Sequence, residues 1–263
     1  MQSSLFAPFD RLIAPPPSAQ RVAFLSAQPF AHRGLHGGAS PENSRAACAA
    51  AVAAGHGIEL DVRAAREGEA FVFHDAVLDR LTAATGPFGA RTADELDHIH
   101  LRGNHETIPR LADILSLVRG RVPVLIEVKA PAHHNIGVLC LGIRRALEGY
   151  SGNVAIMSFN PAIGRWFRIH APRFVRGLVI TEQGATTYLQ RAKRGVARRI
   201  ALWTSQPDFL AYDIRDLPSP FAARQHARGL KLLTWTVRTA QQERTAFAHA
   251  DEIIYEKPLA LAG

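Results

Sequence analysis

From Pro29 onward, short apolar runs alternate with segments whose apolar residues recur at helical spacing. This alternation is typical of a parallel sheet whose strands are connected by helices. The predicted strands end at His32, Asp61, His74, Lys129, Phe159, Thr181, Ile214 and Val237, and one more covers residues 253–255. These are nine candidates for the eight places of a barrel, so we expect one strand to lie outside it. The predicted fold class is α/β, a single-domain (β/α)8 TIM barrel.

Helix start signals agree with this layout. Ser40 has the N-cap chemistry and Pro41 suits the first helical position, and the Ala-rich run that follows is closed by Gly55. Thr92 and Glu95 have the spacing of a capping box. We therefore predict one helix that begins after Ser40 and another that begins after Thr92.

The first 28 residues form a separate N-terminal arm in this interpretation, and the barrel covers residues 29–263. Leu5, Phe6, Phe9, Leu12 and Ile13 recur at helical spacing, and a run of three prolines at residues 15–17 then ends any helix. Two interpretations remain open for the arm. It packs as a plug on the open bottom of the barrel, or it is an amphipathic helix that lies on a membrane surface.

Length and charge narrow the class of protein. A chain of 263 residues is the size of one barrel, for which about 250 residues are typical. The net charge of +8 favours anionic partners, which include phosphate esters, anionic lipid surfaces and nucleic acid. Five basic residues could line one helix: Arg191, Lys193, Arg194, Arg198 and Arg199. Because no aromatic platform accompanies them, a solvated helix face is favoured over nucleic-acid binding. Weak contact with an anionic membrane is the intermediate option, and no obligate protein partner is indicated.

The compartment is predicted from the cysteines and from the N-terminus. Cys48 and Cys140 are the only two cysteines, which gives no disulfide framework and favours small core residues in a reducing compartment. Residues 1–28 lack the features of a secretory signal, and no apolar run is long enough to cross a bilayer. We therefore expect a cytoplasmic protein.

Three carboxylates lie on predicted strands at positions that face the barrel interior. The period of two in a strand places Glu59 and Asp61 on one face of residues 58–62, and Glu127 and Lys129 on one face of residues 125–129. Neighbouring buried carboxylates repel each other and lose hydration, so a cation is needed to hold them there. Carboxylate oxygens suit Mg²⁺ or Ca²⁺. The alternative is an internal salt bridge between Lys129 and one of the acids.

Two histidines and two cations complete a candidate catalytic set. His32 and His74 each close a predicted strand, and the carboxyl ends of barrel strands are where catalytic groups gather. Such a pair can act as general acid and general base. Arg33 has a planar fork that matches phosphate oxygens, and Lys129 adds a point charge. With a divalent cation and three carboxylates, the site would carry about one positive charge, which suits a monoanionic phosphodiester.

The motifs, taken in order, resemble the glycerophosphodiester phosphodiesterase family over nearly the whole chain after residue 29. The matching segments are His32-Arg33-Gly34, Pro41-Glu42-Asn43, Glu59-Leu60-Asp61-Val62, His74-Asp75, Leu78-Asp79-Arg80 with Thr82, Ile108-Pro109, Glu127-Val128-Lys129, Ser158-Phe159 and Trp235-Thr236-Val237. The resemblance implies a TIM-barrel hydrolase that splits a glycerophosphodiester into glycerol phosphate and an alcohol.

The resemblance also implies roles for individual residues. The matched histidines, His32 and His74, would be the acid and the base. One divalent cation, Mg²⁺ or Ca²⁺, would be bound by the matched acids at positions 59, 61 and 127, and the matched Arg33 and Lys129 would bind phosphate. Phe159 and Trp235 are placed at the substrate rim. Glu42 is given a supporting role, as a carboxylate at a helix start that complements the helix dipole.

Two segments depart from the family pattern. The last strand continues as Tyr255-Glu256-Lys257-Pro258 where the family commonly has a Thr-Asp-Pro-like motif. The segment 97–107 is short where the family often carries a capping insertion, which predicts a more open mouth and a bulkier substrate. Two other functions remain in competition: a related barrel lyase that forms a cyclic phosphate from lysophospholipids, and a non-catalytic binder of phosphate headgroups.

Overall fold

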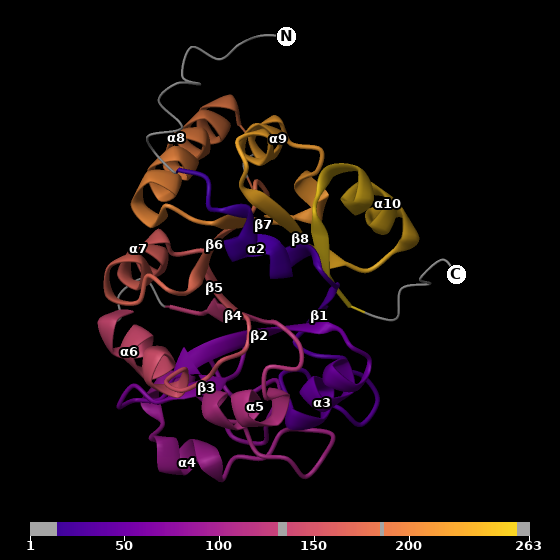
Figure 1. Cartoon of the computed structure of the whole chain (residues 1–263). Coiled ribbons are helices and arrows are strands. Elements are labelled where there is room, and N and C mark those ends of the chain that lie inside the picture. The colour runs from indigo at the N-terminus through magenta and orange to yellow at the C-terminus, as the bar shows by residue number, and fades with distance from the viewer. Residues whose placement is uncertain (1–14, 131–135, 185–186, 257–263) are drawn as a thin grey trace. The chain divides into compact units, whose positions relative to one another are not determined.

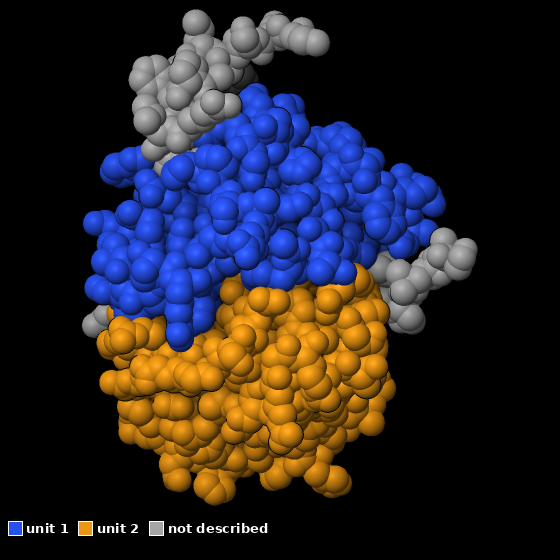
Figure 2. Space-filling model, in the orientation of Figure 1, with its two compact units in different colours: residues 1–27, 156–254, 258–263 blue, residues 28–155, 255–257 orange. Residues whose placement is uncertain are grey.

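The computed structural model describes residues 15–130, 136–184 and 187–256. Two compact units are distinguished in it, and Figure 2 shows them in different colours. Unit 1 consists of residues 1–27, 156–254 and 258–263, and unit 2 consists of residues 28–155 and 255–257. Two strands, β5 (Val154–Ser158) and β9 (Glu252–Tyr255), run across the unit boundaries along the sequence.

Unit 2 begins with the first strand, and Figure 1 labels its α-helices and strands. The elements are β1 (Phe30–His32), α3 (Arg45–Ala53), β2 (Gly57–Ala64), β3 (Ala70–Val72), η2 (Phe88–Ala90), α4 (Ala93–Asp97), α5 (Leu111–Val118), β4 (Val124–Val128) and α6 (Ile136–Ala146). Strand β2 pairs in parallel with both β1 and β4. Its apolar residues at positions 58, 60 and 62 are fully buried. This central strand therefore carries two neighbours whose carboxyl ends lie beside its own.

Strand β3 is the ninth strand that has no place in a barrel. It pairs antiparallel with the last residues of β2, in the register Val62↔Val72 and Ala64↔Ala70. It ends at Val72 and not at His74, because the chain leaves the ladder there and turns into the loop that carries His74. Among the described residues eight strands remain once β3 is set aside, as a (β/α)8 barrel requires.

One predicted helix start is wrong. Helix α3 begins at Arg45, and its N-cap is Ser44, whose hydroxyl accepts a hydrogen bond from Ala47 N. The reason is the backbone at Asn43, which adopts a φ of +61° and whose N–H donates to Arg33 O at 2.9 Å. A residue in this left-handed conformation interrupts a helix, so Ser40 and Pro41 belong to the preceding loop. The capping box of Thr92 and Glu95 at α4 is confirmed.

Unit 1 contains the remaining helices and strands. Its elements are α2 (Ala19–Val22), η1 (Ala23–Ser26), α7 (Pro161–His170), β6 (Val175–Ile180), α8 (Tyr188–Ser205), β7 (Phe209–Asp213), η3 (Ile214–Asp216), α9 (Pro220–Ala227), β8 (Lys231–Val237) and α10 (Ala240–His249). Strands β6, β7 and β8 pair in parallel, in that order. A cluster of buried residues that includes Leu178, Leu210 and Leu232 packs between these strands and the helices.

The described part of the N-terminal arm packs at the amino ends of β6 and β7. Arg21 forms an ion pair with Asp208 at 3.3 Å and donates hydrogen bonds to the carbonyl oxygens of Pro172 and Phe174. Val22 and Leu25 are buried. The apolar residues at positions 5–13, on which both interpretations of the arm depend, lie outside the described residues, so the choice between them stays open.

Two predictions about individual residues and helices can be compared with the structure. Cys48 and Cys140 are free and buried, which confirms that they are small core residues. Within the described ranges, none of the helices combines the length and the apolar character needed to cross a membrane.

Candidate active site

Strand register brings the predicted site residues of unit 2 together. In the β1–β2 pair, His32 lies opposite Glu59, and in the β2–β4 pair, Asp61 lies opposite Glu127. Because these strands are parallel, the carboxyl ends of β1 and β4 lie beside the part of β2 that carries Glu59 and Asp61. Lys129 follows directly after β4, and its backbone N–H donates to Val62 O. The register thus brings these groups together at one edge of the sheet.

The three carboxylates form one buried cluster. Glu59, Asp61 and Glu127 are 1%, 0% and 7% exposed, and one oxygen from each lies within 4.8 Å of the others. Lys129 Nζ lies 3.0 Å from Asp61 Oδ1 and also forms a short ion pair with Glu127. The predicted alternative, an internal salt bridge of Lys129, is therefore present as a contact. It does not account for Glu59, which is not among the ion-pair partners of this lysine.

Burial and charge act differently on the three carboxyl groups. Burial, followed by the charges of Asp61 and Glu127, raises the pKa of Glu59 well above its ordinary value. Burial also raises the pKa of Glu127, against the opposing effect of Lys129. At Asp61 burial opposes ionisation, but Lys129 and Arg33 outweigh it and lower the pKa to about 2. Two protein cations are thus insufficient to hold all three groups in their charged form.

The cluster fits a divalent cation. Glu59 Oε1 is buried and has no hydrogen-bond partner in the described part of the chain, although buried carboxylate oxygens almost always have a partner. The donor set of three carboxylates is typical of hard cations such as Mg²⁺ and Ca²⁺. A cation bound by these oxygens would supply the partner that Glu59 lacks.

Arg33 is held over the cluster by its backbone and by two acids. Its φ of +58° directs its N–H toward Glu59 Oε2, at 3.1 Å. The guanidinium donates to Glu42 Oε1 at 2.6 Å, and its Nε lies 3.1 Å from Asp61 Oδ2. Burial disfavours the charge of Arg33, but Asp61 and Glu42 more than compensate and raise its pKa. The guanidinium is therefore fixed in place and charged.

Glu42 does not complement a helix dipole, because α3 begins three residues after it. It instead accepts hydrogen bonds from Arg33 and from Arg80, at 2.6–2.9 Å. Burial opposes its ionisation, but the hydrogen bonds from Arg80 and the charge of Arg33 lower its pKa. Its role is to connect and orient two arginines.

Asn43 is a site residue to which the sequence assigned no role. Its Nδ2 donates to Asp61 Oδ2 at 3.0 Å, and its Oδ1 accepts from Asp61 N at 3.2 Å. The side chain is buried, and the left-handed φ places it there. Asn tolerates this conformation better than most residues. The signal was available in the Pro41-Glu42-Asn43 segment, but a helix prediction that began at Ser40 concealed it.

His32 is oriented by Glu256. Its Nδ1 lies 2.6 Å from Glu256 Oε1, and its Nε2 lies 3.8 Å from Glu59 Oε2. Burial lowers the pKa of His32, and the hydrogen bond that its ring donates to Glu256 partly offsets this effect. Glu256 belongs to the segment that departs from the family pattern, and its contact with His32 was not predicted from the sequence. His32 thus presents one ring nitrogen to the acid cluster while the other is held by a carboxylate.

His74 is held in the same way by a different carboxylate. Its Nδ1 lies 2.6 Å from Asp75 Oδ1, and Asp75 in turn accepts from Arg80 Nε at 2.6 Å. Burial lowers the pKa of His74, while Asp61 and Asp75 raise it. Its side chain is 32% exposed, compared with 10% for His32. The two histidines therefore differ in access to solvent, although each has a carboxylate partner.

Two predicted rim residues, Phe159 and Trp235, lie in unit 1. Their rings meet edge to face, with centroids 5.7 Å apart. The indole of Trp235 donates to Ala211 O at 3.0 Å, and Phe159 is 46% exposed. These contacts describe a supported aromatic pair within that unit.

The eight predicted site residues of unit 2, with buried carboxylates and paired histidines at parallel strand ends, define a phosphodiesterase-like site. The model of the glycerophosphoryl diester phosphodiesterase family matches residues 32–259, which spans both units. The chain belongs to this family.

Sequence relatives support this membership over different lengths. A glycerophosphodiester phosphodiesterase of Bacillus altitudinis is 36% identical over 107 residues, which cover 38% of this chain and 43% of the relative. The chain therefore matches less than half of that protein's length. A glycerophosphodiester phosphodiesterase of Caldanaerobacter subterraneus is 29% identical over 244 residues, which cover 87% and 93% of the two chains.

Solved structures confirm the TIM-barrel fold class. A phosphodiesterase of Oleispira antarctica, in complex with the product sn-glycerol-3-phosphate, aligns with a TM-score of 0.74 at 20% identity and covers 88% of this chain and 93% of its own. A glycerophosphodiester phosphodiesterase of Thermotoga maritima aligns with a TM-score of 0.66 at 20% identity, with coverages of 86% and 92%. At these identities the likeness shows the fold.

Proposed function

We propose that the protein is a metal-dependent glycerophosphodiester phosphodiesterase, which hydrolyses its substrates to glycerol phosphate and an alcohol. The observation that carries the proposal is the buried cluster of Glu59, Asp61 and Glu127, together with two histidines that are each held by a carboxylate. Membership of the family supports the same reaction. So does the relative from Oleispira antarctica, which was solved with sn-glycerol-3-phosphate as its product.

The cationic residues have the chemistry to bind the phosphodiester. Arg33 keeps its fork geometry through its contacts with Glu42 and Asp61. Lys129 contacts the other carboxylate oxygen of Asp61, at 3.0 Å. A phosphate group between them would receive charge-assisted hydrogen bonds that strengthen as negative charge develops in the transition state.

The histidines supply the proton transfers in this proposal. One removes a proton from the attacking hydroxyl, and the other donates a proton to the departing alkoxide. Glu256 and Asp75 hold the Nδ1 atoms of His32 and His74, so that the Nε2 atoms are the ones that exchange protons. The greater exposure of His74 favours it as the group beside the leaving alcohol.

Glu59, Asp61 and Glu127 would hold one divalent cation, Mg²⁺ or Ca²⁺. Bound there, it would act as a Lewis acid on the phosphoryl oxygens. The partnerless Oε1 of Glu59 supports this assignment.

Turnover of glycerophosphocholine tests the proposal directly. Purified protein is treated with EDTA, dialysed, and assayed with no metal, with Mg²⁺ and with Ca²⁺, while ³¹P NMR identifies the product. We expect glycerol phosphate to appear only when a divalent cation is added. Full activity after exhaustive chelation would contradict the metal assignment, and the absence of turnover under every condition would favour a non-catalytic binder.

The same spectra distinguish the lyase alternative. A lyase that acts on lysophospholipids would accumulate a cyclic phosphate, whose resonance differs from that of a monoester. Hydrolysis gives the monoester as the final product. A persistent cyclic product would replace the hydrolase with the lyase, while leaving the roles of His32 and His74 in the first step unchanged.

We also propose that the protein acts in the cytoplasm. The free, buried thiols of Cys48 and Cys140 are compatible with a reducing compartment. Fractionation of cells that express the tagged chain tests this location, and recovery in an extracellular or periplasmic fraction would contradict it.

A further inference from the structure

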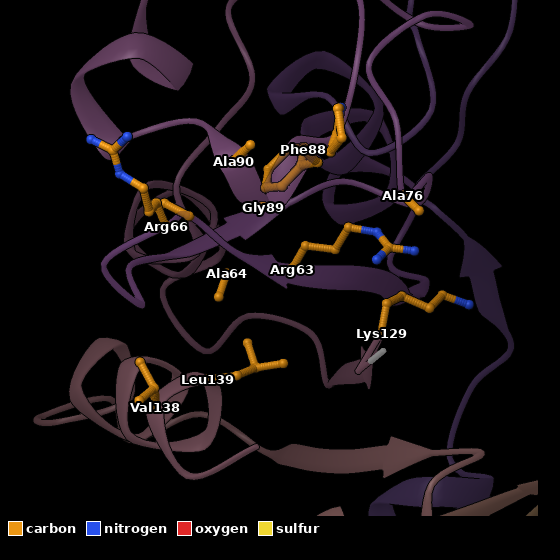
Figure 3. A pocket seen from close by; sticks show the side chains of 12 residues that line it. Arg63, Ala64, Arg66, Ala76, Phe88, Gly89, Ala90, Lys129, Val138 and Leu139 are labelled. Atoms are coloured by element: carbon orange, nitrogen blue, oxygen red, sulfur yellow. The ribbon is translucent and has the colours of Figure 1, made fainter. Parts of the chain in front are cut away.

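A mostly apolar cavity lies beside Lys129 in unit 2 and is shown in Figure 3. Its volume is about 570 Å³. The apolar walls come from the end of β2, the loop that includes η2, and α6: Ala64, Ala65, Pro87, Phe88, Val138 and Leu139. A cavity of this size and lining is suited to an apolar part of a ligand.

The cavity shares two side chains with the candidate active site. Lys129 lines it and forms the ion pair with Asp61. Arg63 also lines it, and its Nε donates to His74 O at 2.8 Å. In Figure 3 the charged ends of Lys129 and Arg63 point the same way, and Val138 and Leu139 lie beyond their stems. The cavity therefore has a polar end at the active site and an apolar remainder.

The charges of the lining exclude a cationic headgroup as the occupant. The charged residues that line the cavity in the described part of the chain are Arg63, Arg66 and Lys129. All three are basic, so choline or ethanolamine would find no anionic partner there. A hydrocarbon chain needs no polar partner, and it gains free energy with each methylene group removed from water.

We propose that this cavity binds a hydrocarbon chain of the substrate, so that the preferred glycerophosphodiesters carry an alkyl or acyl group. The inference rests on the proposed function, because the cavity adjoins the phosphate-binding residues of that site. The chain could come from the departing alcohol, as in an alkyl ester, or from the glycerol, as in a lysophospholipid. Both sources present the same chemistry to Val138 and Leu139.

A series of glycerophospho-n-alkyl esters, from methyl to decyl and below their micellar concentrations, tests the proposal. We expect kcat/KM to rise about fourfold for each added methylene group until the cavity is filled. Lysophosphatidylcholine and glycerophosphocholine form the second arm. A rise confined to one arm identifies the source of the chain, and no dependence on the hydrocarbon in either arm overturns the proposal.

Two residues on α6 give a matched pair of variants. Val138 and Leu141 are each 40% exposed, but Val138 lines the cavity and Leu141 does not. Val138→Asp should flatten the dependence on chain length and leave the methyl ester within about fourfold of wild type, because one buried methylene group is worth only about that factor. Leu141→Asp should leave the dependence unchanged. Equal slopes in the two variants would contradict the assignment of the cavity.

Failure of the cavity and failure of the proposed function give different results. If the methyl ester is turned over but the series is flat, the cavity proposal fails and the phosphodiesterase remains. If no ester is turned over, the proposed function fails. Calorimetry of the octyl and methyl esters then tests whether the cavity binds a hydrocarbon chain, and equal affinities for the two esters would overturn that proposal.

A second inference comes from the distribution of charge in unit 1. The segment 161–205, from α7 through α8, contains nine Lys and Arg residues and one acidic residue, so its formal charge equals the net charge of +8 of the whole chain. The acid, Glu182, is bound to Arg198 at 3.0 Å. The rest of the chain is formally neutral. The positive charge of the protein thus belongs to one pair of helices and the strand between them.

The same helices expose large apolar side chains. Val196, Ile200 and Trp203 on α8 are 57%, 56% and 64% exposed, and their spacing of four and three places them on one face. Ile169, on the neighbouring helix α7, is 54% exposed. Helix α7 packs against α8, where Gly164 allows close approach to Ser205. An exposed tryptophan within a basic surface is typical of helices that lie on anionic membranes.

We infer that this α7–α8 face, defined by Ile169, Val196, Ile200 and Trp203 with the exposed basic residues Arg165 and Lys193, docks on an anionic lipid surface. The apolar side chains enter the boundary of headgroups and acyl chains. The basic residues bind the headgroup charges. Arg176, Arg194 and Arg198 take no part, because they are bound to Asp208, Gln183 O and Glu182, respectively. This corrects the interpretation of all five basic residues of α8 as one solvated face.

Co-sedimentation with vesicles tests the inference. We expect the protein to bind vesicles rich in phosphatidylglycerol, with a blue shift of tryptophan fluorescence, and not vesicles of phosphatidylcholine alone. Trp203→Ser should lower the partition coefficient about tenfold, and Lys193→Glu about fivefold or more. Phe247→Ser is the control, since Phe247 on α10 is 69% exposed but lies outside the α7–α8 face.

Three results would overturn the membrane assignment. The first is equal loss of binding in Phe247→Ser and Trp203→Ser. The second is a dimer that forms with concentration and is broken by Trp203→Ser, which makes the face an interface between two copies. The third is salt-sensitive binding to DNA without binding to anionic vesicles.

Discussion

Two buried carboxylates, one in each unit, differ in how their oxygens are satisfied. Asp208 in unit 1 is 5% exposed and accepts hydrogen bonds from Arg176 N at 2.8 Å and from Arg21 Nε at 3.3 Å. Glu59 in unit 2 is 1% exposed and has one oxygen without a partner among the described residues. The first carboxylate holds the chain together at the amino ends of two strands. The second is kept in an environment that raises its pKa, which is typical of a group retained for function.

The same contrast applies to the cations around each acid. Arg21 and Arg176 outnumber Asp208, so the negative charge there is fully neutralised. In unit 2, Arg33 and Lys129 face three acids. A cluster with excess negative charge costs free energy of folding unless a ligand neutralises it. The difference separates a structural ion pair from a site that is completed by a cation.

The largest expected effect comes from the acid cluster. Chelation of the metal, or Glu127→Gln, should abolish turnover, because each removes a cation that the phosphate needs. The loss should exceed the roughly 10–100-fold effect that is typical of residues one step away from a metal. The measurement is kcat/KM for glycerophosphocholine as a function of Mg²⁺ concentration. Near wild-type activity of Glu127→Gln in EDTA would contradict a cation site, and the acid cluster would then not differ in function from Asp208.

The next largest effect is expected from the two histidines, of which His74 is more exposed than His32. His74→Ala and His32→Ala should each lower kcat/KM for glycerophosphocholine by about 10²–10⁴-fold. A glycerophospho-nitrophenyl ester should largely rescue His74→Ala, because nitrophenolate leaves without a proton, and it should not rescue His32→Ala. Equal losses of both variants on both esters would contradict an acid–base pair.

The geometry explains why the sequence predicted some of these residues and not others. A strand period of two is a local rule, so the shared face of Glu59 and Asp61 could be predicted, and parallel register then aligned Glu127 with Asp61. Asn43 depends on a left-handed backbone turn, which the helix predicted from Ser40 concealed. Glu256 contacts His32 although the two residues are 224 positions apart in the sequence. Contacts of this kind depend on tertiary structure, which apolar periodicity does not describe.

The fold followed the same division between local and distant information. Alternation of apolar runs predicted the strands, and the capping box at Thr92 predicted the start of α4. The start of α3 was wrong because the hydrogen bond from Asn43 N to Arg33 O extends the loop past Ser40. Nine strands could be counted from the sequence, but only the antiparallel pairing of β3 with β2 shows which one is extra.

A smaller effect is expected from the phosphate-binding cations. Arg33→Lys removes the fork that contacts Glu42 and Asp61, and Lys129→Met removes a charge. Each should cost about 2–4 kcal/mol of transition-state binding if the donor points at developing charge. The readout is kcat/KM, and Arg21→Lys is the matched control because that arginine pairs with Asp208 in unit 1. Unchanged kcat/KM in Arg33→Lys would remove Arg33 from the phosphate site.

The smallest expected effect concerns stability, and it tests whether Asp208 is a structural acid and Glu59 is not. Asp208→Asn removes the charge that Arg21 and Arg176 share, and hydrogen bonds to charged groups contribute about 1.5–3 kcal/mol. We therefore expect the free energy of unfolding to fall by about 2 kcal/mol, with kcat/KM unchanged.

Glu59→Gln should have the opposite pattern, with stability kept in metal-free protein and kcat/KM lost. It removes a carboxyl group whose ionisation the buried cluster opposes, so the free energy of unfolding should not fall, while activity is lost. Urea unfolding in EDTA, with both variants and wild type side by side, measures the first quantity, and the glycerophosphocholine assay measures the second. If both variants lose stability alike, Glu59 is as structural as Asp208, and its partnerless oxygen is no sign of a cation site.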